Sequence, residues 1–275
     1  MIESFSVFIL THNDELMLGR LLEDLKNVSN VLIVDSYSTD KTKSVAEKYQ
    51  RKFVQNEFVN QAIQSNWAID NFFGENDWVL RLDSDERIST ELLSELDTYA
   101  VQDEDCVVYI DRYMHWMGKK LKYAGLRPHY IGRMFKRSFA RYEEVTEEHL
   151  IHTVPMKKAV VKFEEDNKNN SMKFWLDKHY KTALGEVHEY FENTNVLKGN
   201  LFSDKDFERK RWLKLKIYNS TPAFLRPFLY FIYRYFFKFG FLDGRAGLSY
   251  CFFQAYFYRM LVDQLIIEKK EWSEW

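Results

Sequence analysis

WVLRLDSDER, which spans Trp78–Arg87, joins a mostly apolar segment to three closely spaced carboxylates. Its first five residues predict a strand that is buried on both faces of a sheet. Asp83, Asp85 and Glu86 then lie within four residues, and like charges this close repel each other unless solvent, a cation or basic groups compensate them. Because α/β sheets bind ligands at the carboxyl ends of their strands, a divalent cation is one candidate for this compensation.

Carboxylate oxygens suit Mg²⁺ or Mn²⁺, and such ions usually bridge one or two protein carboxylates to substrate phosphates. The competing interpretation is a solvated acidic turn before a helix, since Ser89 or Thr90 can cap a helix that begins there. The residues around the stretch favour the metal.

The composition predicts one α/β domain with an appendage, because the chain has 275 residues and 46% of them are hydrophobic. Cys106 and Cys251 show no metal-binding spacing and predict buried thiols in a reducing compartment. The start, Met1–Ser4, lacks a basic region, so we expect no secretory signal. No uncharged apolar run approaches the roughly 20 residues that span a bilayer, so we expect a soluble or peripheral protein.

The N-terminal third alternates short apolar runs with amphipathic segments. The predicted strands are Phe5–Leu10, Val31–Val34, Lys52–Gln55 and Trp78–Leu82, and the predicted helices cover 18–25, 38–49 and 61–73. This alternation predicts a parallel sheet with right-handed crossovers. No G-x-G-x-x-G follows the first strand, so a Rossmann dinucleotide site is unsupported.

The middle of the chain has less regular patterning. After a helix over Thr90–Ala100 and a strand over Cys106–Ile110, the segment Tyr113–Lys162 mixes glycine, proline, aromatic and charged residues without clean periodicity. We expect it to be the irregular half of the domain that carries part of the site, followed by a polar loop over Glu164–Asn170. From Trp175 onward the pattern becomes helical.

The C-terminal region is basic and aromatic. Between Lys205 and Arg245 ten Lys or Arg stand against three Asp or Glu, although the whole chain has a net charge of −2, and this asymmetry predicts a surface for an anionic partner. The run Arg226–Phe239 is apolar nearly all round, with interspersed cations whose stems can snorkel, which favours an anionic membrane surface. The alternative is a helical appendage that packs on the catalytic core or on a second subunit.

Five short blocks, taken in order, resemble glycosyltransferase family 2, and within it the bacterial lipopolysaccharide-core and capsule glycosyltransferases. The blocks are ILTHN at Ile9–Asn13, VDSYSTD at Val34–Asp40, QSN at Gln64–Asn66, WVLRLDSDER at Trp78–Arg87 and GFLDGR at Gly240–Arg245. Each block alone is weak evidence, but five in the right order are strong.

The resemblance implies a GT-A fold, in which helices flank a mostly parallel twisted sheet, followed here by the helical appendage. We expect a catalytic domain over 1–170, with a donor half (1–100) and an acceptor half (101–170), and a helical region over 171–275. The implied reaction uses a nucleotide-sugar donor, a UDP-sugar, with Mn²⁺ or Mg²⁺, and inverts the anomeric carbon. No Q-x-x-R-W motif occurs, which favours a single addition over processive synthesis.

The resemblance also assigns roles to side chains. Asp35 would accept a hydrogen bond from a uracil N–H, and Asp85 would bind the metal together with Asp83, which also faces the ribose and diphosphate. The other donor-binding assignments are Thr11, Asn13, Asp14, Ser36, Gln64, Asn66 and Arg133, the last placed before the final strand of the sheet. Turn capping is the alternative role for Asp14 and Asp35. Gln64 and Asn66 lie two apart on a helix and diverge, so we expect only one to reach the donor.

Inverting transfer also needs a base that deprotonates the acceptor hydroxyl. The acidic cluster Glu143–His149 contains Val145-Thr146-Glu147-Glu148, which resembles the V-H-E-R of the subgroup and makes Glu147 the candidate. Thr146 and Glu148 depart from that pattern, and a solvated acidic face is the alternative.

Two other functions compete with glycosyl transfer. A sugar-1-phosphate nucleotidylyltransferase needs an N-terminal glycine-rich loop, and residues 9–20 contain only Gly19. A non-enzymatic membrane-associated scaffold would use the basic aromatic tail alone. The expected partners are a nucleotide-sugar donor, a glycan or glycolipid acceptor and an anionic membrane surface, with no nucleic acid and with a homo-oligomer as an alternative. We expect a cytoplasmic protein, peripheral on the inner face of the bacterial cytoplasmic membrane.

Overall fold

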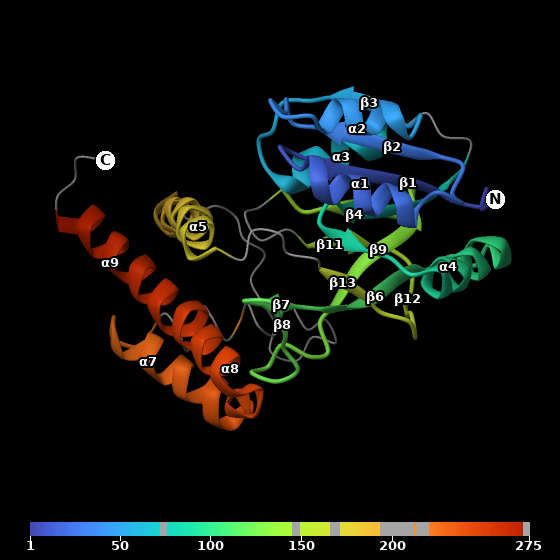
Figure 1. Cartoon of the computed structure of the whole chain (residues 1–275). Helices are drawn as coiled ribbons and strands as arrows, with labels where there is room; N and C mark the ends of the chain where they lie inside the picture. The colour runs from blue at the N-terminus through green and yellow to red at the C-terminus, as the bar shows by residue number, and fades with distance from the viewer. Residues whose placement is uncertain (72–75, 145–148, 166–170, 193–211, 213–219, 272–275) are drawn as a thin grey trace. The chain divides into compact units, whose positions relative to one another are not determined.

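The computed structural model describes residues 1–71, 76–144, 149–165, 171–192, 212 and 220–271. The chain divides into two compact units (Figure 1). Unit 1 comprises Met1–His115 and Arg127–Lys168, and unit 2 comprises Trp116–Leu126 and Asn169–Trp275. The short segment Trp116–Leu126 therefore folds with the C-terminal helices, although it lies in the middle of the sequence.

Unit 1 is an α/β structure. Its helices are α1 (Glu15–Asp24), α2 (Thr42–Lys48), α3 (Gln61–Asn71) and α4 (Thr90–Gln102). Its strands are β1 (Ser6–Thr11), β2 (Val31–Asp35), β3 (Lys52–Gln55), β4 (Trp78–Asp83), β5 (Glu86–Arg87), β6 (Val107–Tyr113), β9 (Tyr130–Lys136), β10 (Ala140–Tyr142), β11 (Leu150–His152), β12 (Met156–Lys158) and β13 (Phe163–Glu165). The elements predicted for the first 110 residues are all present, with boundaries shifted by a few residues at most.

Among the described residues, nine strands form one mixed sheet in the order β3-β2-β1-β4-β9-β6-β13-β5, with β12 paired to β6. Strands β3, β2, β1 and β4 are parallel, whereas β9 runs antiparallel between β4 and β6. Thr11 pairs with Asp35, and Leu10 pairs with Asp83. These registers bring the carboxyl ends of β1, β2 and β4 to one edge of the sheet.

Two hydrophobic clusters cover the two faces of this sheet, because alternate residues of a strand point to opposite faces. Val7 and Ile9 of β1, with Phe5 just before it, pack with α1, α2 and α4. Phe8 and Leu10 pack with α3 and with β10 and β11. The helices therefore flank the sheet as the sequence predicted, and the GT-A fold class is confirmed.

The segment that we expected to be irregular, Tyr113–Lys162, contains strands instead. The central one is β9, whose sequence YIGRMFK carries Gly132 and Arg133 where a strand pattern would place bulkier apolar residues. A Cβ atom at Gly132 would lie 2.7 Å from a methyl carbon of Leu150 and 3.1 Å from the ring of Tyr109, so close packing requires the glycine. Arg133 lies inside this strand rather than before the last strand, and β13 occupies the start of the expected polar loop.

The described part of unit 2 is helical apart from a small hairpin. The hairpin pairs β7 (His115–Trp116) with β8 (Lys119–Lys120), and the other elements are α5 (Met172–Glu192), α7 (Leu225–Ile232), the π-helix η2 (Tyr233–Phe237), the 3₁₀-helix η3 (Gly240–Asp243), α8 (Gly244–Tyr250), the π-helix η4 (Cys251–Phe257) and α9 (Tyr258–Glu271). Trp116 contacts Trp175 of α5 and Tyr250 of α8 edge to face, so the hairpin packs into the helices.

The predicted C-terminal helical region is therefore confirmed. Both cysteines are buried, as predicted. Across the described parts of the chain, no helix combines the length and apolarity that crossing a bilayer requires.

Candidate functional site

The loops that follow β1 and β2 bind each other at the edge where these strands end. Asn13 adopts a positive φ of 49°, a region that asparagine tolerates better than most residues. Its side-chain oxygen accepts hydrogen bonds from the backbone N–H groups of Thr39 at 2.7 Å and Asp40 at 3.3 Å. A ring nitrogen of His12 lies 2.9 Å from the carbonyl of Ser36. The first two sequence blocks thus form one continuous polar rim.

Asp35 lies at the centre of this rim and is fully buried. Its carboxylate accepts hydrogen bonds from the backbone N–H of Ser38 at 2.8 Å, from the Ser38 hydroxyl, and from the side-chain amide of Gln55 at 3.0 Å. The capping role is therefore present in the structure. To bind Asp35, a uracil N–H would have to replace one of these donors or share a carboxylate oxygen with it.

The end of β4 joins the same rim. The hydroxyl of Ser84 donates to the Asp14 carboxylate at 2.7 Å, and the backbone N–H of Asp14 donates to Thr42 at 3.1 Å. The hydroxyl of Thr11 is buried and has no hydrogen-bond partner among the residues that the structure describes. A buried polar group in that state is costly, so Thr11 is well suited to a ligand contact.

Gln64 and Asn66 diverge, as their spacing predicted. Gln64 is buried and donates from its side-chain amide to the hydroxyl of Ser36 at 3.2 Å, so it belongs to the rim. Asn66 instead donates to the carbonyl of Tyr142 and accepts from its N–H, both at 2.9 Å, and thereby joins α3 to β10.

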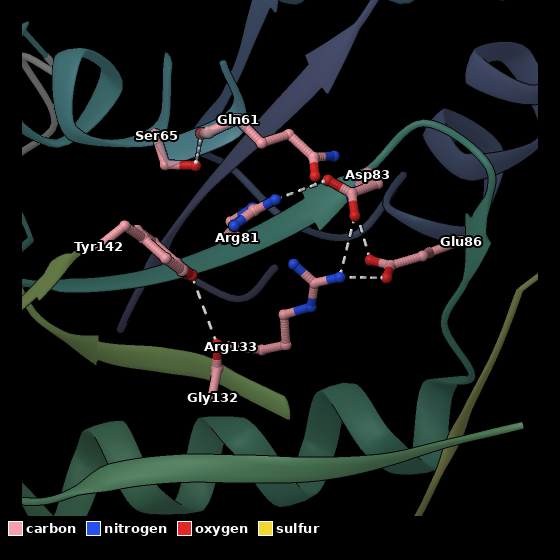
Figure 2. Close-up of polar contacts among 8 residues, drawn as sticks. All are labelled: Gln61, Ser65, Arg81, Asp83, Glu86, Gly132, Arg133 and Tyr142. Atoms are coloured by element: carbon pink, nitrogen blue, oxygen red, sulfur yellow. Dashed lines mark hydrogen bonds and ion pairs between the residues drawn. The ribbon is translucent and has the colours of Figure 1, made fainter. Parts of the chain in front are cut away.

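Charged side chains form a network at the end of β4 (Figure 2). Arg81 of β4 donates to one oxygen of Asp83 at 3.2 Å, and Arg133 of β9 donates to the other at 3.0 Å. Arg133 also pairs with Glu86, whose second oxygen accepts the backbone N–H of Asp83 at 3.0 Å. Both oxygens of Asp83 therefore contact guanidinium groups.

The network shifts the pKa values of its two carboxyl groups in opposite directions. Burial alone would raise the pKa of Asp83, but Arg133 and Arg81 together hold it well below its usual range. Burial raises the pKa of the Glu86 carboxyl to about 7 against the opposing effect of Arg133, and Asp83 adds to the rise. Asp83 is therefore a carboxylate at neutral pH, held in one orientation by two cations.

Sequence reasoning missed three members of this arrangement, namely Arg81, Glu86 and Tyr142. The Tyr142 ring lies 4.7 Å from the Arg81 guanidinium carbon, and its hydroxyl donates to the carbonyl of Gly132 at 3.4 Å (Figure 2). One signal was available, since a lone arginine in an otherwise apolar buried strand needs a charged partner. Arg133, assigned to phosphate by resemblance, contacts Asp83 and Glu86 in the structure.

The donor atoms at this edge fit a divalent ion of a particular kind. Within the described ranges, no group of three or more His, Cys, Asp or Glu side chains could hold a metal by itself. Asp83 is engaged by two arginines, and Asp85 follows it on the turn after β4, half-buried. This donor set suits Mg²⁺ or Mn²⁺, which take one or two carboxylates and complete their shell with substrate phosphates and water.

The acidic cluster proposed to supply the base is only partly described, and Glu147 lies outside the described residues. On its flanks, the backbone N–H of Glu143 donates to the carbonyl of His149 at 2.8 Å, and the Asn66 amide lies 3.5 Å from a carboxylate oxygen of Glu144.

A mostly parallel sheet with polar loops at one edge, an acidic turn after the fourth strand and flanking helices defines a GT-A nucleotide-diphospho-sugar transferase type of domain. The sequence matches the glycosyl transferase family 2 profile over residues 6–163, which is more than half of the chain. The chain therefore belongs to glycosyl transferase family 2.

Individual proteins also resemble parts of the chain. An uncharacterised glycosyltransferase of Rickettsia conorii is 38% identical over 96 residues, covering 34% of this chain and 33% of that protein. The lipopolysaccharide core biosynthesis glycosyltransferase LpsC of Rhizobium meliloti is 29% identical over 146 residues, covering 50% of this chain and 53% of LpsC. The match thus spans about a third to a half of the length of these relatives. Among solved structures, S. aureus TarS has a TM-score of 0.45 at 17% identity, covering 90% of this chain and 54% of TarS.

Proposed function

We propose that this chain is an inverting glycosyltransferase that moves one sugar from a nucleotide-diphosphate donor, a UDP-sugar, to an acceptor hydroxyl. The observation that carries the proposal is the polar rim at the carboxyl ends of β1, β2 and β4, in a chain of family 2. The name of LpsC supports a cell-surface glycan or its lipid-linked precursor as the acceptor. Such an acceptor would suit a peripheral protein at the inner face of the cytoplasmic membrane.

The donor would lie along the rim. Thr11, Asn13, Asp14 and Ser36 line the strand ends, with Asp35 and Gln64 buried behind them. The unpartnered Thr11 hydroxyl offers a donor or acceptor to the base or ribose, and Asp35 can accept from a uracil N–H in place of Gln55. Rotation of the Gln55 side chain on the edge strand β3 would remove one donor from that oxygen, which would still accept the backbone N–H of Ser38 at 2.8 Å.

Asp85, together with Asp83, would hold Mn²⁺ or Mg²⁺. When bound, the ion stabilises negative charge on the leaving nucleoside diphosphate. The contribution of the chain itself is orientation, since Arg81 and Arg133 fix the Asp83 carboxylate from two sides. This arrangement keeps Asp83 ionised and prevents its carboxylate from turning away from the site.

Glu147 is the proposed base. Glu147→Gln keeps the size of the side chain but removes proton acceptance. We expect kcat to fall by about 10²–10⁴-fold, the usual cost of losing a general base, with unchanged donor affinity.

The matched controls for this change are Glu144→Gln and Glu148→Gln, which should stay within about tenfold of the wild-type rate. If Glu147→Gln keeps most of its activity while one control loses it, the alignment across the acidic cluster is shifted.

A thermal-shift screen of nucleotide sugars tests the donor class, because a ligand that binds only the folded state raises its stability by about 2.7 kcal/mol at a concentration of 100 Kd. We expect UDP-sugars to raise the melting temperature in the presence of Mn²⁺ and to lose this effect in EDTA. Release of UDP with transfer of the sugar supports the proposal. Pyrophosphate release from UTP and a sugar 1-phosphate would instead identify a nucleotidylyltransferase.

A further inference from the structure

Helix α7 and its continuation η2 bury their cations. Arg226 is 8% exposed and binds the carboxylate of Asp263 on α9 through its Nε at 2.8 and 3.0 Å and through a second nitrogen. Arg234, also 8% exposed, donates to the carbonyl of Ala124 at 2.7 Å and stacks over Tyr250. The inward side of this segment is therefore held by charged and polar contacts.

The outward side of the same segment is apolar. Its residues recur at helical spacing and leave between 46% and 70% of their surface exposed: Leu225, Phe228, Leu229, Tyr233, Phe236 and Phe237. This is the reverse of a soluble amphipathic helix, which buries its apolar stripe and exposes its charges. Exposed apolar patches of this kind mark binding surfaces. We call these six residues the aromatic face.

The apolar surface continues past η2, where cations join it. Phe239, Phe241 and Leu242 are exposed in the turn and in η3. Lys238 and Arg245 are exposed beside them. The hairpin of unit 2 adds Lys119 and Lys122, because Lys119 donates to the carbonyl of Asp243 at 3.2 Å and the backbone N–H of Lys122 donates to its carboxylate at 3.1 Å. We call Lys119, Lys122, Lys238 and Arg245 the cationic fringe.

No exposed carboxylate opposes this fringe within the described stretch 220–257. Its one acidic residue, Asp243, is 5% exposed and accepts the backbone N–H groups of Lys122 and Tyr123. Within this stretch, the exposed surface thus combines large apolar side chains with positive charges and no negative ones.

We propose that the aromatic face and the cationic fringe form the surface by which unit 2 binds an anionic lipid bilayer. Aromatic side chains enter the boundary between headgroups and acyl chains, and lysine and arginine stems reach the lipid phosphates from the same level. A second copy of this chain fits the surface less well. A two-fold contact would bring together two copies of a surface that carries positive charge, and like charges repel.

This inference rests on the membrane location in the proposed function but not on the transfer reaction. Co-sedimentation of the full chain with vesicles measures it directly. We expect binding to vesicles that contain phosphatidylglycerol, weak binding to pure phosphatidylcholine, and weaker binding in 0.5 M NaCl, because salt screens the fringe.

Two variants separate the two halves of the surface. Lys122→Ala with Arg245→Ala should lower partitioning onto the anionic vesicles by about 25-fold, about fivefold per cation, which corresponds to ~1 kcal/mol each. Phe228→Ser with Leu229→Ser and Phe237→Ser should lower it by at least tenfold on both vesicle types. Val101→Ser with Val160→Ser, which changes two exposed apolar residues of unit 1, is the matched control and should bind like the wild type.

The shift in melting temperature caused by UDP and Mn²⁺ reports separately on the fold and on the proposed function. Variants that keep this shift but lose vesicle binding support the inference. Wild-type binding by both surface variants overturns it, and so does equal binding to neutral and anionic vesicles. A wild-type dimer that the triple serine variant converts to monomer, with no vesicle binding by either, assigns the aromatic face to a second copy instead. If the serine variant fails to fold, the two surface alanines still decide the outcome.

Discussion

The end of β4 and the α7–η2 segment both bury arginines, but they use them differently. At the end of β4, Arg81 and Arg133 surround Asp83, while Asp85 follows on the turn at the sheet edge that carries the polar rim. In unit 2, Arg226 and Asp263 bind each other and leave the outer side of the helix to apolar residues.

Buried arginine–carboxylate pairs therefore have different roles in the two regions. Buried ion pairs contribute little net stability against apolar residues of the same shape, although breaking one of them is costly. At β4 the pairs fix the direction of a carboxylate beside a proposed ligand site. At α7 the pair anchors a helix whose apolar side remains outward. The β4 pairs therefore act on the proposed ligand site, and the α7 pair acts on the outer surface of unit 2.

The sharpest test of this division is Asp85→Asn. We expect it to reduce sugar transfer by about 10³-fold or more, since metal charge stabilisation is worth several kcal/mol and each 1.36 kcal/mol is tenfold. The melting temperature should stay close to that of the wild type. Removal of divalent ions by EDTA should have the same effect on the wild-type rate.

Asp77→Asn, at the opposite end of the same strand, is the control, because its side chain is 82% exposed and pairs only loosely with Arg137 at 3.6 Å. It should leave transfer unchanged. Full activity of Asp85→Asn in EDTA would show that transfer needs no metal at Asp85. The charges at the end of β4 would then have a structural role only, like those at α7.

Removing one partner of each buried pair comes next in size. Arg133→Leu and Arg226→Leu should each lower the free energy of unfolding by about 3–5 kcal/mol, because each leaves a buried carboxylate uncompensated. Urea unfolding followed by circular dichroism measures the loss.

The paired variants sharpen the comparison. Adding Asp263→Leu to Arg226→Leu should recover most of the lost stability, since the two side chains chiefly bind each other. Adding Glu86→Leu to Arg133→Leu should recover less, since Asp83 also loses Arg133. Equal recovery in both units would show that the β4 charges form independent pairs rather than a network.

Much of unit 1 was predictable because its signals are local. An apolar run followed by turn residues gave β1, β2 and β4 within one or two residues, and the spacing of Leu18, Leu21 and Leu22 gave α1. The strand β9 was missed because its place depends on pairing with β4 and β6, while Gly132 and Arg133 break the pattern that a reader of the sequence expects. Pairing partners distant in the chain leave no periodic signal.

The site was predictable in its residue types but not in its contacts. The sequence blocks named Thr11, Asn13 and Gln64, and the structure brings them to one rim. The pairing of Arg133 with Asp83 joins residues fifty positions apart, and only the register of β4 with β9 reveals it. Whether each of these side chains binds the donor remains a prediction, as does the role of Glu147.

The smallest effect that we expect concerns Asp243, another buried charge of unit 2. Its carboxylate accepts the N–H groups of Lys122 and Tyr123 at 2.9–3.2 Å, and these contacts hold the hairpin that carries Lys119 and Lys122. Asp243→Asn leaves one acceptor oxygen and removes the charge. Hydrogen bonds to charged groups contribute about 1.5–3 kcal/mol, so losing part of this set should cost about 1–2 kcal/mol in urea unfolding.

The same variant should weaken binding to anionic vesicles only modestly, because the aromatic face stays in place while part of the cationic fringe loses its support. Ser249→Ala is the matched control, since it removes only neutral hydrogen bonds to the same hairpin. Trp116 donates to the Ser249 hydroxyl at 3.1 Å, and this hydroxyl donates to the sulfur of Met117 at 3.6 Å. Ser249→Ala should cost about 1 kcal/mol or less and leave vesicle binding unchanged. If Asp243→Asn keeps full stability, the charge of the GFLDGR block does not hold the hairpin. Close packing at Gly247, where a Cβ would lie 2.0 Å from the carbonyl oxygen of Gly240, would then be what fixes this turn.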